Sequence, residues 1–545
     1  MDNTSSCSEP LKLKQSVCEM SAKICEKSDA GNPKSETAES SERTVLISET
    51  ISVSNSDKKC IFFYRIPLKV NQIPSSFPSK FIDLWDSKAH IKMPCSASNQ
   101  VILVKTIEGK KVQTRLKKWE LITTHLLADR LLTLDDFVTA IKAYNPVMID
   151  DDFAVLRCLI EECYDFDDRR DFFDNLLPKL TQLALKLPQL VTQPIPILRQ
   201  KENKTLFFSQ EQVSCLLANA FFCTYPKRSL PQYKKLPEIN FRSLFSNGTD
   251  KMRVKVEKLK CILNYFKRVT EETPIGVVSF ERRSLSEQEI PSWSTSKKSL
   301  RNLQVFSDGL IENQGKGMLQ VDFANKFVGG GVLSSGCVQE EIRFIINPEL
   351  IISRLFTESL LDNEVLIVCG TEQFSQYIGY ADTFRYKGDF IDTTSIDEFN
   401  RRNTQIVAID ALYFNFNSRE LQYQPECFHR ELNKAYTGFL EKNVVNHSPV
   451  ATGHWGCGAF NGDPQLKAII QLLAASESER DIVYFTFGDS NFKSRFEELY
   501  DILQINYSNV CSLYKKTLAF CDQRNKNPNV DLFTYLINIC STDEI

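Results

Sequence analysis

The feature that most restricts the fold of this chain is a change of pattern near residue 270. Beyond it, short β-branched and aromatic runs recur at 276–280, 318–323, 365–369, 405–409 and 481–487. Amphipathic segments such as 348–359 and 464–476 lie between several of these runs. Near-continuous apolar strands that alternate with helices are typical of a sheet covered on both faces. We therefore predict an α/β domain, with bounds 236–545.

The region before this domain has a helical pattern. Apolar residues recur at three- and four-residue steps through 117–140 and again from Leu206 to Phe222. Ser209 stands where a helix N-cap is expected. No group of residues that suggests chemistry occurs here, so we predict a mainly helical accessory domain at 58–235.

The N-terminal stretch, residues 1–57, has the composition of a disordered tail. It contains no aromatic residue, the first being Phe62, and it is rich in Ser, Lys and Glu. Such a segment cannot bury enough apolar surface to offset the entropy of ordering it. Its lysines could belong to a targeting signal, but a solvated tail is the simpler interpretation.

Charge and composition exclude several classes of function. The net charge of −3 over 545 residues lacks the basic excess of proteins that wrap nucleic acid, so no direct DNA binding is expected. The 17 cysteines form no C-x-x-C pair and the five histidines are scattered, which makes a zinc site improbable and favours reduced thiols. No run approaches the ~20 apolar residues of a membrane span, and the polar start resembles no signal peptide. We expect a nuclear or cytoplasmic protein.

The strongest local signal for chemistry is the segment 328–341, which reads VGGGVLSSGCVQEE. Three consecutive glycines after a strand allow positive φ angles and a close approach of the backbone to a ligand. Their successive N–H groups can form an anion-binding concavity without a lysine. Taken alone, the same run could be a flexible turn.

The glycines are followed by Gln339, Glu340 and Glu341, and this pairing suggests a nucleotide-linked glycoside as substrate. Cleavage of a glycosidic bond needs a carboxylic acid to protonate the departing oxygen. Because neighbouring side chains on a helix or strand diverge, we expect one glutamate to be the acid and the other to bind ribose hydroxyls. The alternative is a solvated helix start favoured by the helix dipole.

Three further features extend the candidate site. Asp322 ends a predicted strand and Asn325 follows it, where α/β folds bind ligands, although both residue types also cap turns. A second glycine loop, 452–460, can supply more backbone donors, as a diphosphate requires. Phe487 ends the last strong strand and could stack on an adenine, although packing is the commoner role of Phe.

With both loops in view, the chain resembles the poly(ADP-ribose) glycohydrolase family of animals. The glycine triplet followed by Gln-Glu-Glu carries the resemblance. Further segments of similar sequence lie at 318–325, 341–344, 347–356, 370–373, 455–460, 479–489 and 206–212. It covers residues 60 to 540. It implies a macrodomain with a mixed sheet flanked by helices, behind the helical accessory domain. It also implies hydrolysis of the ribose–ribose bonds of poly(ADP-ribose) on modified proteins, a place in the DNA damage response, a monomer, and no metal or cofactor.

The resemblance also implies roles for individual residues. Glu341 would be the general acid and base, Glu340 would hold the ribose hydroxyls, and Asp322 would be the third acidic member of the site. The residues implied in substrate binding are Ile311 and Glu312 at the adenine, Asn325, Gly329, Gly330, Gly331, Gln339, a closing Tyr380, His454, Trp455, Gly456, Cys457, Gly458, Ala459, Phe460, and Phe487 stacked on the adenine. Vertebrate members carry Asn where this chain has His454.

The implied mechanism uses one carboxylate twice. Glu341 donates a proton to the leaving ribose oxygen and then activates water, while pairing with Glu340 and burial raise one carboxyl pKa toward neutrality. Three alternatives stay open at this point. They are a non-catalytic ADP-ribose reader on the same fold, a hydrolase of other ADP-ribose conjugates such as esters, and a scaffold.

Overall fold

The computed structural model describes residues 59–69, 71–107, 110–128, 131–228, 233–246, 251–441, 447–506, 509–526 and 531–542. The predicted disordered tail, 1–57, lies outside the described residues. Within them, no helix combines the length and the apolar character that a membrane crossing requires. No disulfide joins the cysteines that the structure describes.

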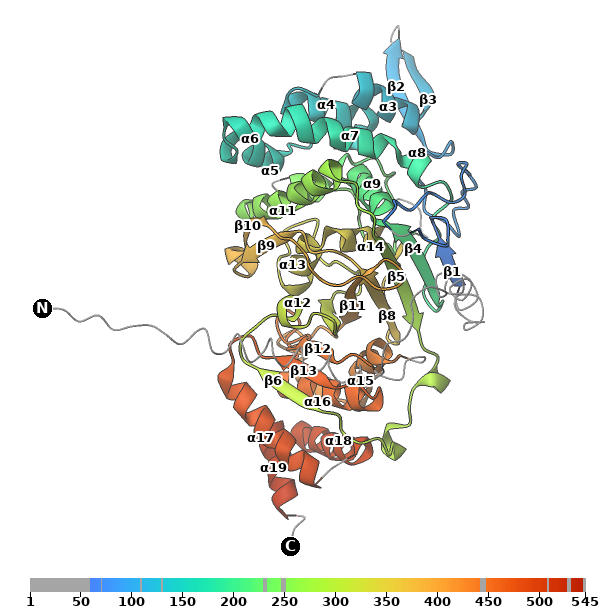
Figure 1. Ribbon diagram of the computed structural model, residues 1–545. Coiled ribbons are helices and arrows are strands. Elements are labelled where there is room, and N and C mark those ends of the chain that lie inside the picture. The colour runs from blue at the N-terminus through green and yellow to red at the C-terminus, as the bar shows by residue number, and fades with distance from the viewer. Residues whose placement is uncertain are drawn as a thin grey trace, which may run out of the picture. The chain divides into compact units, whose positions relative to one another are not determined.

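The fold is organised around a mixed sheet of nine strands (Figure 1). Parallel pairing joins β11 to β7, β7 to β12, β12 to β13 and β13 to β6, and antiparallel pairing joins β11 to β8, β8 to β5 and β5 to β4. In sheet order the strands are β1 (Lys59–Phe62), β4 (Lys204–Ser209), β5 (Val277–Ser284), β8 (Glu364–Gly370), β11 (Arg402–Asp410), β7 (Leu319–Ala324), β12 (Val450–Gly453), β13 (Ile482–Phe485) and β6 (Leu303–Phe306).

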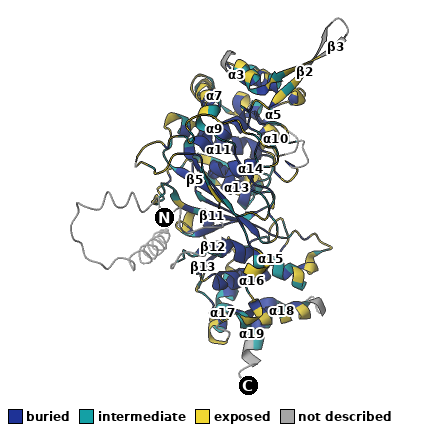
Figure 2. Ribbon diagram, turned by 90° about the vertical axis from the view of Figure 1, so that its right-hand side faces the viewer, coloured by how far each residue is buried: buried dark blue, intermediate teal, exposed yellow. Residues whose placement is uncertain are grey.

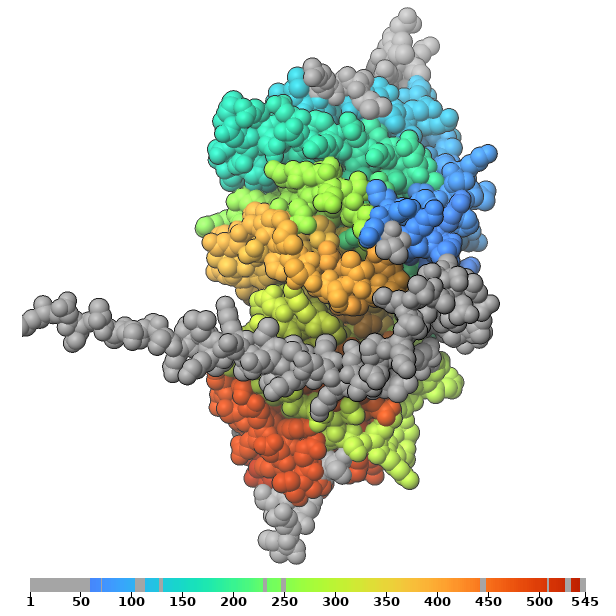
Figure 3. All heavy atoms as spheres, viewed as in Figure 1, coloured from blue at the N-terminus to red at the C-terminus, as the bar shows by residue number. Residues whose placement is uncertain are grey.

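Two antiparallel hairpins stand apart from this sheet: β2 (Gln100–Ile107) with β3 (Lys110–Lys117), and β9 (Ser375–Ile378) with β10 (Arg385–Asp389). The second hairpin matters for function because it brings two tyrosines to the site described below. In the space-filling view this part of the chain forms an orange band of surface beside the green helical region (Figure 3).

Helices cover both faces of the sheet, as the sequence predicts. One group packs with the first hydrophobic core: α3 (Lys118–Ala128), α4 (Leu134–Tyr144), α5 (Ala154–Arg157), α7 (Leu177–Leu185), α8 (Leu187–Leu190), α9 (Gln210–Phe221), α10 (Arg242–Phe245), α11 (Met252–Glu271), α13 (Gln339–Ile346) and α14 (Ser353–Phe356). The second core holds α15 (Pro425–Phe439), α16 (Pro464–Glu477), α17 (Ser490–Asn506), α18 (Val510–Lys526) and α19 (Leu532–Thr542). Two further short α-helices are α6 (Phe166–Asp171) and α12 (Ile311–Gln314).

The alternation of side chains along the central strands separates the two cores. In β8, Leu366 and Val368 belong to the first core, whereas Val365 and Ile367 belong to the second. Successive residues of a strand point to opposite faces, so a continuous apolar run serves both layers. The central strands and helices α9, α11 and α13 are accordingly buried (Figure 2).

The helical expectation for the region before 236 is correct in outline but wrong at two places. The pattern from 117 to 140 forms two helices, α3 and α4, with a connection between them. Residues Leu206 to Ser209 are not helical but form strand β4, which pairs with β5. Ser209 ends that strand and is the predicted N-cap of α9, where its hydroxyl accepts a hydrogen bond from Gln212 N.

The predicted division at residue 235 does not coincide with a break in packing. Strands β1 and β4 come from the accessory region and extend the main sheet. Helix α11 comes from beyond the division and packs in the first core with α7 and α9. The two parts of the chain therefore share a sheet and a core, and the boundary stays a prediction.

Candidate active site

A cavity of about 730 Å³ opens where the parallel strands β6, β13, β12 and β7 end at their carboxyl ends. Most of the residues predicted to bind substrate line it: Ile311, Glu312, Gln339, Tyr380, His454, Trp455, Gly456, Gly458, Ala459, Phe460 and Phe487. These residues span 177 positions of sequence and come from the ends of different strands. The prediction that they share one site is therefore supported by their placement.

The acidic residues lie behind this lining. Glu340 and Glu341 occupy the first turn of α13, and their neighbours Gln339 and Ile342 line the cavity. The two glutamates are only 3% and 6% exposed. The alternative interpretation, a solvated helix start, is therefore wrong. Asp322, Asn325, the glycine triplet and Cys457 are likewise not among the lining residues.

The glycine loop wraps around the two carboxylates. Gly329 N donates to Glu340 Oε1 at 2.6 Å, and Gly331 N donates to Glu341 Oε1 at 2.8 Å. The second oxygens accept from Asn325 N and Val338 N, each at 2.9 Å. Four backbone donors thus orient the pair, and the N-terminus of α13 favours negative charge at the same place.

At Gly330, both the backbone conformation and the surrounding space require a glycine. Its φ of +43° lies in the left-handed region, and a methyl group there would lie 2.5 Å from Glu341 Oε1 and 2.7 Å from Glu340 Oε2. Both carboxylates therefore meet at one point of the loop. The expectation that adjacent glutamates point apart is wrong for their carboxylates, because the loop donors draw them together.

The two glycine loops differ in their free donors. In the first, Gly330 N donates to Phe327 O, so the N–H groups of Gly329, Gly330 and Gly331 are all engaged within the chain. In the second loop, no acceptor among the described residues takes the N–H groups of Gly456, Gly458, Ala459 and Phe460. The binding of a diphosphate by the first loop stays a prediction. For these three N–H groups to bind phosphate, they would have to break their present hydrogen bonds within the chain.

Burial and like charge perturb the acidic cluster. Burial raises the pKa of Glu340 well above its usual range, and the carboxylates of Asp322 and Glu341 raise it further. The N–H groups of Asn325 and Gly329 oppose this rise. Burial and the charge of Glu341 also raise the pKa of Asp322, which Arg343 opposes. The predicted rise in a carboxyl pKa is thus found at Glu340, and Asp322 shares it.

The comparisons with known proteins agree with this geometry. Residues 164–282 match the family model described as "Poly (ADP-ribose) glycohydrolase (PARG), helical domain", and residues 290–494 match "Poly (ADP-ribose) glycohydrolase (PARG), Macro domain fold". The chain is 35% identical over 468 residues to poly(ADP-ribose) glycohydrolase 1 of Arabidopsis thaliana, an alignment that covers 70% of this chain and 84% of that protein.

The chain belongs to the poly(ADP-ribose) glycohydrolase family.

Two further relatives of the family support the same grouping. The chain is 33% identical to a probable poly(ADP-ribose) glycohydrolase 2 of Arabidopsis thaliana, over 69% of this chain and 83% of that protein. It is also 33% identical to poly(ADP-ribose) glycohydrolase 2 of Caenorhabditis elegans, over 61% of this chain and 68% of that protein. The match to the macrodomain family model, residues 290–494, contains the glycine loop, the paired glutamates and all residues that line the cavity. The predicted macrodomain with a helical N-terminal domain is therefore confirmed.

Three predicted site residues differ locally from the expectation. Asp322 lies inside β7 instead of ending it, and neither of its carboxylate oxygens has a hydrogen-bond partner among the described residues. Asn325 Oδ1 accepts from Phe327 N at 2.9 Å, which is the turn-capping alternative. Phe487 lies two residues beyond the end of β13, where it lines the cavity with its ring edge-on to Phe323.

The sequence reasoning missed two polar residues of the cavity. Tyr377, on β9, donates its hydroxyl to Glu312, the predicted adenine partner. Arg343 lies on the lining side of α13, one turn after Glu340, and its charge reaches Asp322. The helical spacing from Glu340 could have indicated Arg343. Nothing local to Tyr377 indicates its role, because a hairpin brings it to Glu312.

His454 is surrounded by aromatic neighbours. Its Nδ1 lies 3.1 Å from the Tyr484 hydroxyl, and its ring meets Phe492 edge-on at 4.8 Å. Burial lowers the pKa of His454, which favours the neutral imidazole. Among the described residues, no group of three or more potential metal ligands comes together.

Proposed function

We propose that this chain hydrolyses the ribose–ribose O-glycosidic bonds of poly(ADP-ribose) and releases free ADP-ribose. The observation that carries the proposal is the buried carboxylate pair, oriented by four backbone donors at the edge of the cavity. Membership of the glycohydrolase family supports the same reaction. The activity reverses the modification of proteins by this polymer.

The cavity has the features that an ADP-ribose unit requires. Its volume of about 730 Å³ suits a dinucleotide-sized ligand, and its aromatic lining includes Phe460 and Phe487. The free N–H groups of the second glycine loop supply donors for a diphosphate. Glu312 offers a carboxylate to the exocyclic amine of an adenine. The predicted roles of these residues fit this arrangement.

The chemistry follows from the position of the two glutamates. Protonated Glu341 donates its proton to the ribose oxygen that leaves, and the glycosidic C–O bond breaks as the sugar gains oxocarbenium character. The substrate's own diphosphate stabilises that positive charge. Glu341, now ionised, takes a proton from water as the water oxygen bonds to the anomeric carbon. Glu340 holds the ribose hydroxyls during both steps.

Two rival functions make different demands on this site. A non-catalytic reader of ADP-ribose needs the donors of the second loop but not a cluster of buried carboxyls in which burial raises the pKa of Glu340 and of Asp322. A hydrolase of ester-linked ADP-ribose cleaves an acyl–oxygen bond, whereas in the proposed mechanism Glu341 protonates the glycosidic oxygen, which leaves as a ribose hydroxyl. The first ADP-ribose unit of the polymer, which is attached to the modified protein, should therefore be cut poorly and remain as a stub.

Product analysis tests the proposal. Purified polymer is incubated with the protein in excess EDTA, and the digest is separated by chromatography. We expect ADP-ribose as the main product, because carboxyl groups transfer the protons and backbone N–H groups bind the phosphates. AMP or phosphoribosyl-AMP as the dominant product, or complete loss of activity in the chelator, would contradict the glycosidase mechanism.

We further propose that the protein acts in the nucleus or the cytoplasm, within the response to DNA damage, as a monomer without direct DNA binding. The absence of a basic excess, with a net charge of −3, supports recognition of the polymer through a local pocket. Localisation of the tagged full-length chain and light scattering of the purified protein test these points.

A further inference from the structure

The carbonyl groups of the glycine loop are held by a buried arginine. Arg354, on α14, is only 6% exposed, and its Nη1 donates to Val328 O and to Gly330 O, each at 3.0 Å. Its Nε donates to Glu238 O at 2.9 Å, which fixes the guanidinium from the other side. A planar guanidinium with fixed donor directions suits such bridging better than an ammonium.

These two carbonyls belong to the peptide groups that hold the glutamates. The Val328 carbonyl shares a peptide group with Gly329 N–H, which binds Glu340. The Gly330 carbonyl shares one with Gly331 N–H, which binds Glu341. Hydrogen bonds in series polarise one another in a low-dielectric interior, so the cation strengthens both contacts with the carboxylates.

A buried lysine holds the second half of the same loop. Lys258, on α11, is 0% exposed, and its Nζ donates to Gly336 O at 2.6 Å, Ser334 O at 2.9 Å and Gly331 O at 3.2 Å. An ammonium has three N–H donors, and all of them face the loop. Helix α11 lies in the part of the chain that matches the family's helical domain.

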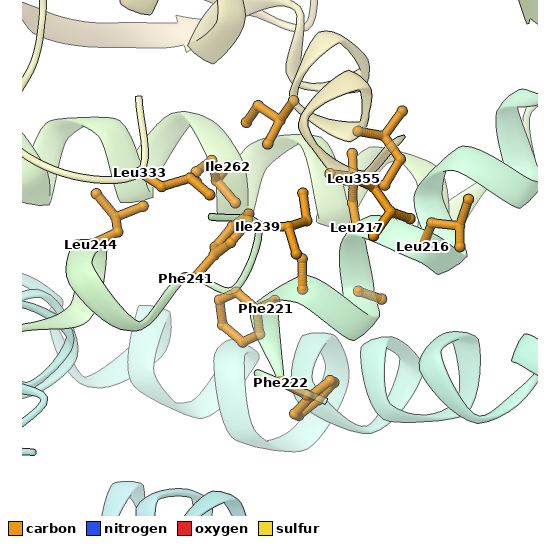
Figure 4. Packing of buried hydrophobic residues seen from close by; sticks show 14 of the residues in the cluster. Leu216, Leu217, Phe221, Phe222, Ile239, Phe241, Leu244, Ile262, Leu333 and Leu355 are labelled. Carbon is orange, nitrogen blue, oxygen red and sulfur yellow. The ribbon is translucent and has the colours of Figure 1, made fainter. Parts of the chain in front are cut away.

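Apolar packing fastens the loop to the same helix. Leu333, at the tip of the loop, is 4% exposed and belongs to the first core with Ile262 of α11. Figure 4 shows Leu333 beside Ile262, with Leu355 of α14 elsewhere in the same cluster. Helix α11 of the helical region thus contacts the loop through the Lys258 ammonium and through Ile262, which packs beside Leu333 of the loop.

We propose that Arg354 and Lys258 are positioning residues that fix the Glu340 and Glu341 carboxylates through the backbone of the glycine loop. Neither cation contacts the substrate cavity, and each acts through peptide groups. The helical region is thereby required for the geometry of catalysis as well as for the core. This inference rests on the proposed function.

Both cations keep their charge in neutral solution. Burial lowers the pKa of Arg354 to about 10 and that of Lys258 to about 8. Attraction to Glu341 opposes the fall at both residues, and Glu340 also opposes it at Arg354. The two positive charges therefore face the acidic cluster at pH 7.

The first test replaces Arg354 by Met and uses Arg480→Met as the matched control. Arg480 is 3% exposed, its pKa is also lowered to about 10, and its Nε and Nη1 donate to Phe439 O and Ser448 O, away from the glycine loop. We expect kcat for polymer hydrolysis to fall by about 10²-fold in Arg354→Met, because misplaced catalytic groups cost this much. The Kd for ADP-ribose, measured by calorimetry, should change less than about threefold.

The second test applies the same logic to Lys258→Met. Its control is Lys255→Met on the same helix, because Lys255 is 4% exposed and donates to Ser243 O and Ser246 O, not to the loop. We expect kcat to fall by about tenfold only in Lys258→Met. Arg354→Lys, which keeps the charge but reaches fewer carbonyls, should recover part of the kcat lost in Arg354→Met.

The outcomes separate this inference from the proposed function. If the parent protein fails to hydrolyse the polymer, the proposed function fails. If the parent is active and Arg354→Met turns over like Arg480→Met, only the inference fails. If Arg354→Met does not fold, hydrogen exchange measured on the parent protein tests the proposal instead. Peptides that cover 328–337 should exchange more slowly than ordinary loop segments, and rapid exchange would overturn the proposal.

Discussion

The two glycine loops of this site use the same backbone freedom in opposite ways. In the loop at 328–336, the N–H groups of Gly329 and Gly331 bind the chain's own carboxylates, and the carbonyls face Arg354 and Lys258. In the loop at 452–460, the N–H groups of residues such as Gly456 have no acceptor among the described residues, and these residues line the cavity. One loop is an internal support, and the other is open to a ligand.

This difference shows what a run of glycines can and cannot indicate. Glycine allows the backbone to approach an anion closely, but it does not say whether that anion belongs to a ligand or to the chain itself. In the first loop the anions are Glu340 and Glu341, which follow the glycines in sequence. The comparison predicts that damage to the first loop lowers turnover, whereas damage to the second lowers affinity.

Among the variants that compare the two loops, the largest effect is expected at the first loop, in Gly330→Ala. The new methyl group would lie 2.5 Å from Glu341 Oε1 and 2.7 Å from Glu340 Oε2, so both carboxylates must move. We expect kcat to fall by about 10²- to 10³-fold, while the Kd for ADP-ribose stays within about threefold of the parent value. Steady-state kinetics on polymer and calorimetry with ADP-ribose measure the two effects.

The control for this variant is Gly317→Ala. Gly317 also has a positive φ, +75°, but a methyl group there meets nothing within 4 Å. It reproduces the backbone strain without the contact with the carboxylates. Equal loss of turnover in both variants would show that strain, and not displacement of the glutamates, causes the effect.

The second loop should give the opposite pattern in Gly456→Ala. Gly456 has φ +75°, and a methyl group there would lie 2.6 Å from Ala411 Cβ, so the loop must shift. We expect the Kd for ADP-ribose to rise by about 10- to 100-fold as the N–H donors lose their directions, with a smaller change in kcat at saturating polymer. A fall in kcat with unchanged affinity would break the comparison between the loops.

A smaller effect, on stability, is expected in Asp322→Asn. The Asp322 carboxylate is buried without a hydrogen-bond partner among the described residues, and burial raises its pKa well above the usual range. A carboxyl whose pKa is higher in the folded state than in the unfolded state stabilises the fold below the unfolded pKa, near 4. This stabilisation is lost as the pH rises through the folded-state pKa. Asn should therefore stabilise the fold by about 1–2 kcal/mol at pH 7 and by less at pH 4.

Denaturant unfolding at both pH values measures this difference. The same variant should lose turnover, because the third acidic group of the site is gone. If Asp322→Asn is less stable than the parent at pH 7, the Asp322 carboxylate stabilises the fold, and the expectation is wrong.

The smallest effect is expected in His454→Asn. Asn can keep the hydrogen bond to the Tyr484 hydroxyl but loses the edge-on contact with Phe492. An aromatic contact of this kind contributes about 0.5–1.5 kcal/mol, so we expect the Kd for ADP-ribose to change by about two- to twelvefold at most. A change of a hundredfold would mean that His454 contacts the ligand more directly than its packing indicates.

Local patterns predicted the parts of this protein that local physics determines. The five β-branched runs all became strands, because continuous apolar residues suit a sheet that is buried on both faces. Strand β4 was read as the start of a helix, because Leu206-Phe-Phe is apolar without a clear period and runs directly into α9. The short β12, Val450–Gly453, carries too little β-branched sequence to be found, and its neighbours in the sheet determine it.

The candidate site divides in the same way. The glutamate pair and the residues that line the cavity could be predicted, because their motifs are contiguous and resemble a known family. The hydrogen bonds from Lys258 and Arg354 to the glycine loop could not be predicted. They join side chains to loop carbonyls that lie 73 and 24 residues away along the chain. Nor could the use of the loop's N–H groups, which depends on the turn that folds 329–331 back over α13.

The most direct test of the account is Glu341→Gln, assayed for polymer turnover and for ADP-ribose affinity in the same preparation. The amide keeps the shape of the side chain but cannot donate a proton and take it back. We expect turnover to fall by about 10²- to 10⁴-fold or more, with a Kd for ADP-ribose close to that of the parent. Turnover near the parent level would contradict the assignment of Glu341 as the group that transfers the proton.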